Sequence, residues 1–126
     1  MSSTATRALA PLALMGLIFY LSGQEQVGPE LPAFTRVIAH FTEYTVLASL
    51  WIWALVPRFG RDGLIAAVVI SALYAASDEW HQSFVAGRDS DPVDWLIDCA
   101  GIAFAVFLSR RPSLRRAASR RPPTSR

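Results

Sequence analysis

The sequence has little charge and a single cysteine. Charged residues make up 17% of the 126 residues, hydrophobic residues make up 52%, and the mean hydropathy is positive. This composition excludes an ordinary soluble domain of this size. The lone Cys99 excludes an intramolecular disulfide and leaves the redox compartment open. The length suits one domain only.

Lysine is absent. All twelve basic residues are arginine, and seven of them lie beyond Leu108, so the net charge of +2 hides a basic C-terminal tail at residues 110–126. We predict that this Arg/Pro/Ser-rich tail is disordered, cytoplasmic and in contact with anionic headgroups, where each basic residue contributes about 1 kcal/mol. Nucleic-acid binding is the rival interpretation, but a basic tail beside a membrane segment more often reflects topology and lipid contact, so we expect no nucleic-acid partner.

Four apolar segments predict an all-α membrane bundle of four transmembrane helices over residues 1–109. The segments are 8–22, 37–56, 64–80 and 91–108. A bilayer core needs about 20 apolar residues; the second segment reaches this length, the third nearly does, and the outer two fall short by an amount that helix packing can accommodate. Pro11 is predicted to lie near the start of its helix, Pro57 to end the second, and Asp91-Pro92 to cap the fourth.

The loops predict that both ends of the chain lie in the cytoplasm. The connection at residues 57–63 carries Arg58 and Arg61 and lies on the same side as the basic tail. Acidic residues dominate the two connections on the other side: Glu25, Glu30, Asp89 and Asp91. Because positively charged loops stay inside, we predict a multi-pass membrane protein with an N-in/C-in topology.

The first segment has some features of a secretory signal peptide, because Arg7 precedes an apolar stretch. However, no clean small-x-small cleavage site follows, and Gln24 stands where a lipoprotein has its modified cysteine. We therefore expect the segment to be retained as a transmembrane helix.

Polar residues inside the apolar segments form the most informative pattern. Helical spacing places His40 and Glu43 on one face of the second segment, and it places Asp94 and Asp98 on a stripe of the fourth that continues into small residues able to pack closely. Since the second and fourth segments begin, and the third ends, on the same side, these groups should share one level near the extracytoplasmic face. The candidate ligand-pocket residues are His40, Glu43, Asp78, His81, Gln82, Arg88, Asp94 and Asp98.

Ionisable side chains within a membrane are costly and usually mark a functional site. We interpret three acidic residues differently, as a helix cap or as solvated rim residues: Glu79, Asp89 and Asp91. A purely structural explanation of the others also stays open, in which Arg88 neutralises Asp94 and His40 forms a hydrogen-bonded pair with Glu43.

Three stretches resemble the VanZ-like family of small bacterial membrane proteins, which is named for a teicoplanin-resistance component. They are LIFYLSGQ (17–24), HFTEYTVLASL (40–50) and YAASDEWHQSFVAGRDSDPVDWLIDCAG (74–101). The resemblance implies a cell-envelope role and a multi-pass location in the bacterial plasma membrane. Two departures stand out: the family often has Asn where this chain has Asp98, and it tends to have an acidic-basic pair before the HF motif, where this chain has Arg36-Val37.

Three functions compete. In the first, a pocket at the extracytoplasmic face binds or protects a lipid-linked or amphiphilic cell-envelope component, in a role like that of glycopeptide resistance. The ligand would be an amphiphile such as a lipid-linked cell-wall intermediate or a lipoglycopeptide, with Arg88 meeting its phosphate or carboxylate. Asp94 and Asp98 would then need a proton, Arg88 or a cation to relieve their repulsion. We rank this function first.

The second function is an intramembrane enzyme on the same class of substrate, with His81 as general base or with histidines and carboxylates around a Zn or Mn ion. The sequence leaves the cofactor undetermined, and it has no HExxH pattern, Gly-x-Ser-x-Gly elbow or phosphate loop. The third function is a structural subunit of a membrane complex. An ion channel is a distant fourth, because the inner halves of the segments are apolar.

Overall fold

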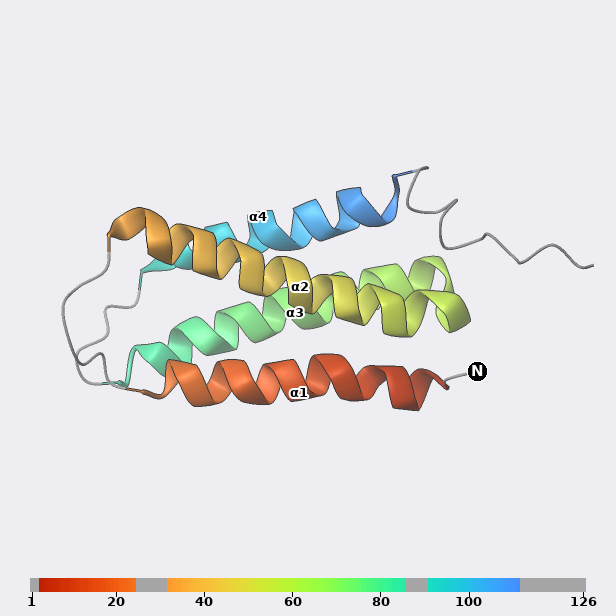
Figure 1. Cartoon of the computed structure of the whole chain (residues 1–126), viewed down its shortest axis with the longest axis horizontal. Helices are drawn as coiled ribbons and strands as arrows, with labels where there is room; N and C mark the ends of the chain where they lie inside the picture. Colours follow the sequence, from red (N-terminus) through yellow and green to blue (C-terminus); the bar gives the residue numbers. More distant parts are fainter. Residues whose placement is uncertain (1–2, 25–31, 86–90, 112–126) are drawn as a thin grey trace, which may run out of the picture.

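The computed structural model describes residues 3–24, 32–85 and 91–111, and within these residues the chain forms four helices and no strand. The helices are α1 (Thr4–Ser22), α2 (Ala33–Phe59), α3 (Arg61–Gln82) and α4 (Pro92–Ser109). Each helix runs antiparallel to the one before it, so that α2 and α4 are parallel to each other (Figure 1). The predicted all-α class is confirmed.

The bundle has two chemically different ends. We call the end where α1 and α3 finish and α2 and α4 begin the polar end; it carries the buried carboxylates described below. The opposite end, here the arginine end, carries five described arginines: Arg7, Arg58, Arg61, Arg110 and Arg111. Figure 1 shows the N-terminus, the α2–α3 corner and the end of α4 together at the arginine end.

Three of the four helices are long and apolar enough to cross a membrane: α1, α3 and α4. α2 is the longest helix but falls outside this set among the described residues. Its first half carries polar side chains such as His40 and Glu43, which lower its hydropathy. The chain therefore has several candidate spans, and the crossing of α2 stays a prediction.

The helices extend beyond the apolar segments that predicted them. α1 begins at Thr4, capped by the Ser3 hydroxyl, so Pro11 lies inside the helix and the prediction that it stands near the start is wrong. α2 continues past Pro57 to Phe59, which corrects the prediction that the proline ends it. Apolar runs mark the part of a helix that avoids water, whereas the backbone hydrogen bonds continue into polar sequence.

The α2–α3 corner is also shorter than the predicted loop at residues 57–63, because Gly60 alone separates the two helices. Gly60 has a φ of 57°, a conformation that residues with a Cβ rarely adopt. The glycine thus lets the chain reverse without a loop.

α2 is the centre of the bundle and packs against all three other helices. Its fully buried Tyr44, Leu47 and Ala48 contribute to one apolar core with residues of α1, α3 and α4. The α2–α4 contact is tight: a Cβ on Gly101 would lie 2.5 Å from the Phe41 carbonyl oxygen. The Thr45 hydroxyl bonds to the Gly101 carbonyl at 3.0 Å. The small-residue stripe of the fourth segment therefore does allow close packing.

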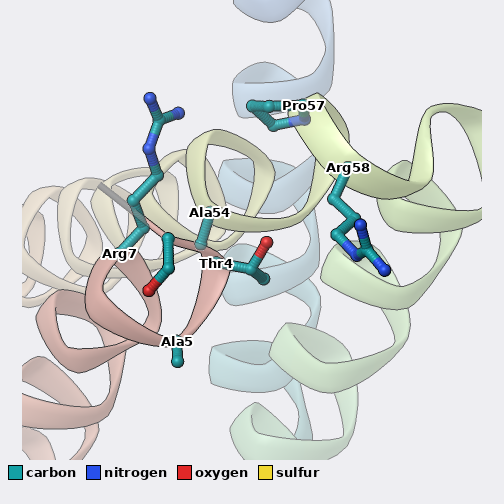
Figure 2. Close-up of a pocket in the computed structure, with 7 residues that line it drawn as sticks. Thr4, Ala5, Arg7, Ala54, Pro57 and Arg58 are labelled. Atoms are coloured by element: carbon teal, nitrogen blue, oxygen red, sulfur yellow. The ribbon is translucent and has the colours of Figure 1, made fainter. Parts of the chain in front are cut away.

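Arg7 compensates for a defect in α2 that Pro57 creates. Proline has no N–H, so the carbonyl of Trp53, four residues earlier, loses its helical donor. Arg7 Nη1 donates to this carbonyl at 3.1 Å, and its guanidinium packs 4.8 Å from the centre of the Trp53 ring. Figure 2 shows Arg7 on α1 beside the turn of α2 that carries Ala54 and Pro57. The arginine thus joins the start of α1 to the end of α2.

This arrangement predicts a coupling between the two residues. Arg7→Gln should lower the free energy of unfolding by about 1 kcal/mol, since it leaves a carbonyl without a donor. In a Pro57→Ala background, where the helix supplies an N–H, the same substitution should cost less. Unfolding of the four proteins in mixed micelles measures the difference; equal costs in both backgrounds would contradict the assignment.

Candidate functional site

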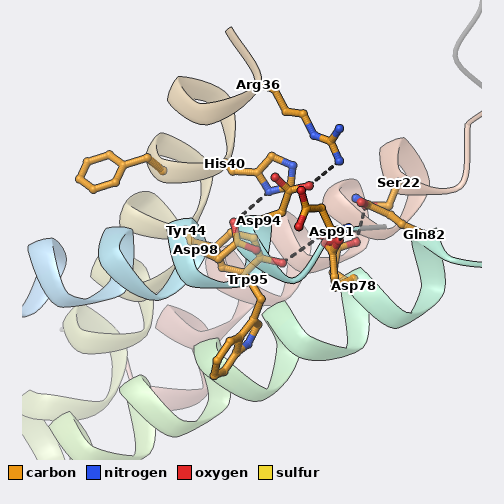
Figure 3. A network of polar contacts seen from close by, with 12 residues as sticks. Ser22, Arg36, His40, Tyr44, Asp78, Gln82, Asp91, Asp94, Trp95 and Asp98 are labelled. Atoms are coloured by element: carbon orange, nitrogen blue, oxygen red, sulfur yellow. Dashed lines mark hydrogen bonds and ion pairs between the residues drawn. The ribbon is translucent and has the colours of Figure 1, made fainter. Parts of the chain in front are cut away.

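Polar side chains from all four helices meet at the polar end. Those with less than a tenth of their surface exposed there are Ser22, Asp78, Glu79, Gln82, Asp94 and Asp98. Figure 3 shows several of them converging with side chains from α2. The prediction that the polar residues of the second, third and fourth segments share one level agrees with this geometry.

Two charged or ionisable pairs connect α2 to α4. Arg36 donates to Asp94, and His40 Nδ1 lies 2.9 Å from Asp98 Oδ1 (Figure 3). In both pairs the partners are 58 positions apart, because the two helices run parallel and in register. Residues four apart on each helix therefore form a two-rung ladder across the contact.

The two rungs of the ladder differ in how deeply they are buried, but the same helix supplies the more exposed partner in both. Arg36 is 43% exposed and Asp94 8%; His40 is 12% exposed and Asp98 1%. In each pair the nitrogen side chain of α2 is thus more exposed than the carboxylate of α4. Arg36 supplies a positive charge to Asp94, and His40 supplies a hydrogen-bonding partner to Asp98.

A second polar network holds α1, α2 and α3 together around Asp78. The Ser22 hydroxyl donates to Asp78 Oδ1, and the Tyr44 hydroxyl donates to Oδ2 at 3.1 Å. Gln82 Nε2 in turn donates to the Ser22 hydroxyl at 3.3 Å. Both oxygens of the buried Asp78 carboxylate therefore have donors, as buried polar groups require.

Glu79 corrects one interpretation from the sequence. It is 8% exposed rather than a solvated rim residue, and its Oε1 accepts the Asp91 backbone N–H at 2.7 Å. Glu79 thus fixes the start of α4 against the end of α3. Asp91 itself is a helix cap, as expected, because its Oδ1 accepts from the Val93 N–H at 3.0 Å.

His81 lies apart from the α2–α4 ladder. Its ring stacks on Phe19 of α1, with the ring centres 4.5 Å apart. Within the described ranges, two buried polar atoms of the site make no hydrogen bond: His81 Nδ1 and Asp98 Oδ2. A buried acceptor such as Asp98 Oδ2 is costly unless a proton, water or ligand atom meets it.

The remaining candidate residues have different outcomes. Glu43 is half-buried on α2, but it is Asp98 rather than Glu43 that pairs with His40. Arg88 and Asp89 lie outside the described residues, and the basic tail beyond Arg111 does too. Asp94, which we expected Arg88 to neutralise in the structural explanation, is paired with Arg36.

Sequence reasoning missed Arg36 as a site residue. A signal was present: Arg36 and His40 are spaced by four residues, as are Asp94 and Asp98, and the charges are complementary. This pattern becomes informative only once α2 and α4 are known to be parallel neighbours.

The α2 side chains Arg36 and His40 are hydrogen-bonding groups and are more exposed than the α4 carboxylates with which they pair. This arrangement suits recognition of a polar or anionic group. In the described part of the chain, no three His, Cys, Asp or Glu side chains are placed so that they could hold a metal ion.

Comparison with known proteins identifies the family. The model of the VanZ/LLP1 family matches residues 4–114, which include all four helices and both ends of the bundle. The chain belongs to the VanZ/LLP1 family. No curated protein and no solved structure matches it. VanZ/LLP1 membership and the three candidate spans fit a multi-pass membrane protein, and the α2–α4 ladder lies within the VanZ/LLP1 match.

Proposed function

We propose that this protein binds the anionic headgroup of an amphiphilic cell-envelope component at its polar end. The component is a lipid-linked cell-wall intermediate or an amphiphile of similar build, such as a lipoglycopeptide. Binding would sequester or shield it, which is the kind of role that the VanZ/LLP1 family's link to teicoplanin resistance suggests.

One observation carries the proposal: in both rungs of the ladder the α2 nitrogen is more exposed than its α4 carboxylate. A ligand that approaches the polar end meets Arg36 and His40 first. The planar Arg36 fork suits a phosphate or carboxylate, and Asp94 behind it fixes its orientation.

The proposal includes an orientation in which all four helices cross the plasma membrane of a bacterial cell and the polar end is extracytoplasmic. The arginines at the opposite end support it, because positive segments stay inside. In a Cys99→Ala background, an impermeant maleimide should label Ser83→Cys in intact cells and leave Ser3→Cys unlabelled. The reverse pattern would place the polar end in the cytoplasm.

A thermal-shift experiment tests the binding. A polyprenyl phosphate should raise the Tm of the purified protein, and the matching polyprenol should not, because only the phosphate offers an anion to Arg36. Arg36→Gln should weaken the binding by about tenfold or more, the effect of one lost charged hydrogen bond. Arg61→Gln, an exposed arginine at the other end, is the matched control. A shift of equal size with phosphate and alcohol, or an unchanged response in Arg36→Gln, would contradict the proposal.

The His40–Asp98 pair favours a second candidate function, acid–base catalysis on the same substrate class. The Asp98 carboxylate beside Nδ1 fixes the tautomer of the His40 imidazole and the direction of its Nε2. In other aspartate–histidine pairs this arrangement prepares the histidine to accept a proton. An enzyme would convert the bound lipid, so chromatography of the polyprenyl phosphate after incubation distinguishes turnover from binding alone.

A further inference from the structure

We propose that the arginine end carries a second ligand site, which binds the phosphate of an acidic phospholipid. A groove of about 580 Å³ lies between the first turn of α1 and the last turns of α2. Thr4, Ala5 and Arg7 line it from α1, and Ala54, Pro57 and Arg58 line it from α2 (Figure 2). The proposal concerns the opposite end of the bundle from the proposed function and does not depend on it.

The charge of the groove points to an anion. Two arginines from different helices line it, and none of the described residues that do so is acidic. Arg58 packs 5.8 Å from the centre of the Phe59 ring, which positions its guanidinium near the groove. A guanidinium has five N–H donors, so stacking on a ring leaves it able to bind a phosphate.

The start of α1 adds further donors to the two arginines. The first amides of a helix have no acceptor within it, and the Ser3 hydroxyl accepts from the Thr6 N–H at 3.1 Å. The Thr4 and Ala5 amides therefore lie at the positive end of the α1 dipole, beside the groove. Backbone donors and two guanidinium groups together match the several oxygens of a phosphate.

The surroundings of the groove favour a lipid over a soluble anion. Large apolar side chains on the same two helices remain exposed: Leu9 (64%), Trp53 (46%) and Phe59 (51%). In a membrane these side chains would meet acyl chains, which places the groove at the depth of the headgroups. Basic pockets between membrane helices are a usual form of acidic-lipid site.

Lipid titration of the full-length protein tests the site. Native mass spectrometry would follow phosphatidylglycerol binding in a neutral detergent, with phosphatidylcholine as the uncharged comparison. Arg58→Gln should weaken phosphatidylglycerol binding by about tenfold, the effect of one lost charged hydrogen bond. Arg61→Gln removes a charge from the same end without touching the groove and should change the affinity less than about twofold. Arg7→Lys keeps the charge but loses the planar fork, and should weaken binding while the protein stays folded.

Three outcomes would overturn the proposal. Equal losses in Arg58→Gln and Arg61→Gln would mean that general surface charge attracts the lipid rather than a built site. Displacement of phosphatidylglycerol by inorganic phosphate at matched concentration would mean that the groove binds the free anion and that the lipid is not its specific ligand. A loss in Arg36→Gln alone would locate the binding at the polar end and leave the groove without a ligand.

Discussion

Gly101→Ala is expected to lower the free energy of unfolding by about 1–3 kcal/mol, the usual cost of overpacking a tight contact. The added Cβ would lie 2.5 Å from the Phe41 carbonyl oxygen and 3.1 Å from the Thr45 hydroxyl. Neither neighbour is the free end of a flexible chain, so α4 must move away from α2. Because Arg36–Asp94 and His40–Asp98 span the same contact, the substitution should also weaken ligand binding at the polar end.

Gly16→Ala is the matched control, because nothing lies within 4 Å of the Cβ it would add. Alanine is the better helix former by about 1 kcal/mol, so this variant should be neutral or more stable. Both proteins can be unfolded in mixed micelles and followed by tryptophan fluorescence. If Gly101→Ala is as stable as Gly16→Ala, the close α2–α4 packing is wrong.

His40→Leu should be strongly destabilising, by about 3–5 kcal/mol, because it removes one partner of a buried pair. Asp98 is only 1% exposed, and its Oδ2 already makes no hydrogen bond to the described residues. Without His40 the carboxylate would have no nearby compensating group and would have to take up a proton to stay buried.

The double variant His40→Leu/Asp98→Leu distinguishes this explanation from simple loss of packing. Replacing both partners of a buried pair with apolar residues is often neutral, so the double variant should recover much of the stability. Asp62→Asn, an exposed acidic residue at the arginine end, should change stability by less than about 0.5 kcal/mol. A double variant no more stable than His40→Leu would show that the pair is not the source of the cost.

The fold was largely predictable because hydrophobic runs and charged loops act locally. The four apolar segments predicted four helices in the correct order, and Asp91-Pro92 predicted the start of α4. The errors at Pro11 and Pro57 have one cause: hydropathy identifies the apolar part of a helix and not its hydrogen-bonded ends. The Arg7 contact with the Trp53 carbonyl could not be predicted, because it depends on where α1 begins.

Most residues of the buried polar cluster could be predicted from the sequence, but the pairs that they form could not. Polar residues in apolar sequence identified His40, Asp78, Asp94 and Asp98. Their partners depend on which helices are neighbours and on their register, and neither property is visible in a single sequence. Arg36 was missed for this reason, and Glu79 was assigned to the surface because its acceptor role depends on the approach of α4.

Native mass spectrometry of the protein purified from its own host membrane tests the central claim, that the polar end is a ligand site, most directly. The account predicts a discrete amphiphile with an anionic headgroup on the wild type and on the Arg61→Gln control. Arg36→Gln and His40→Gln, folded by circular dichroism, should both lose it. The same adducts on all four proteins would contradict the claim.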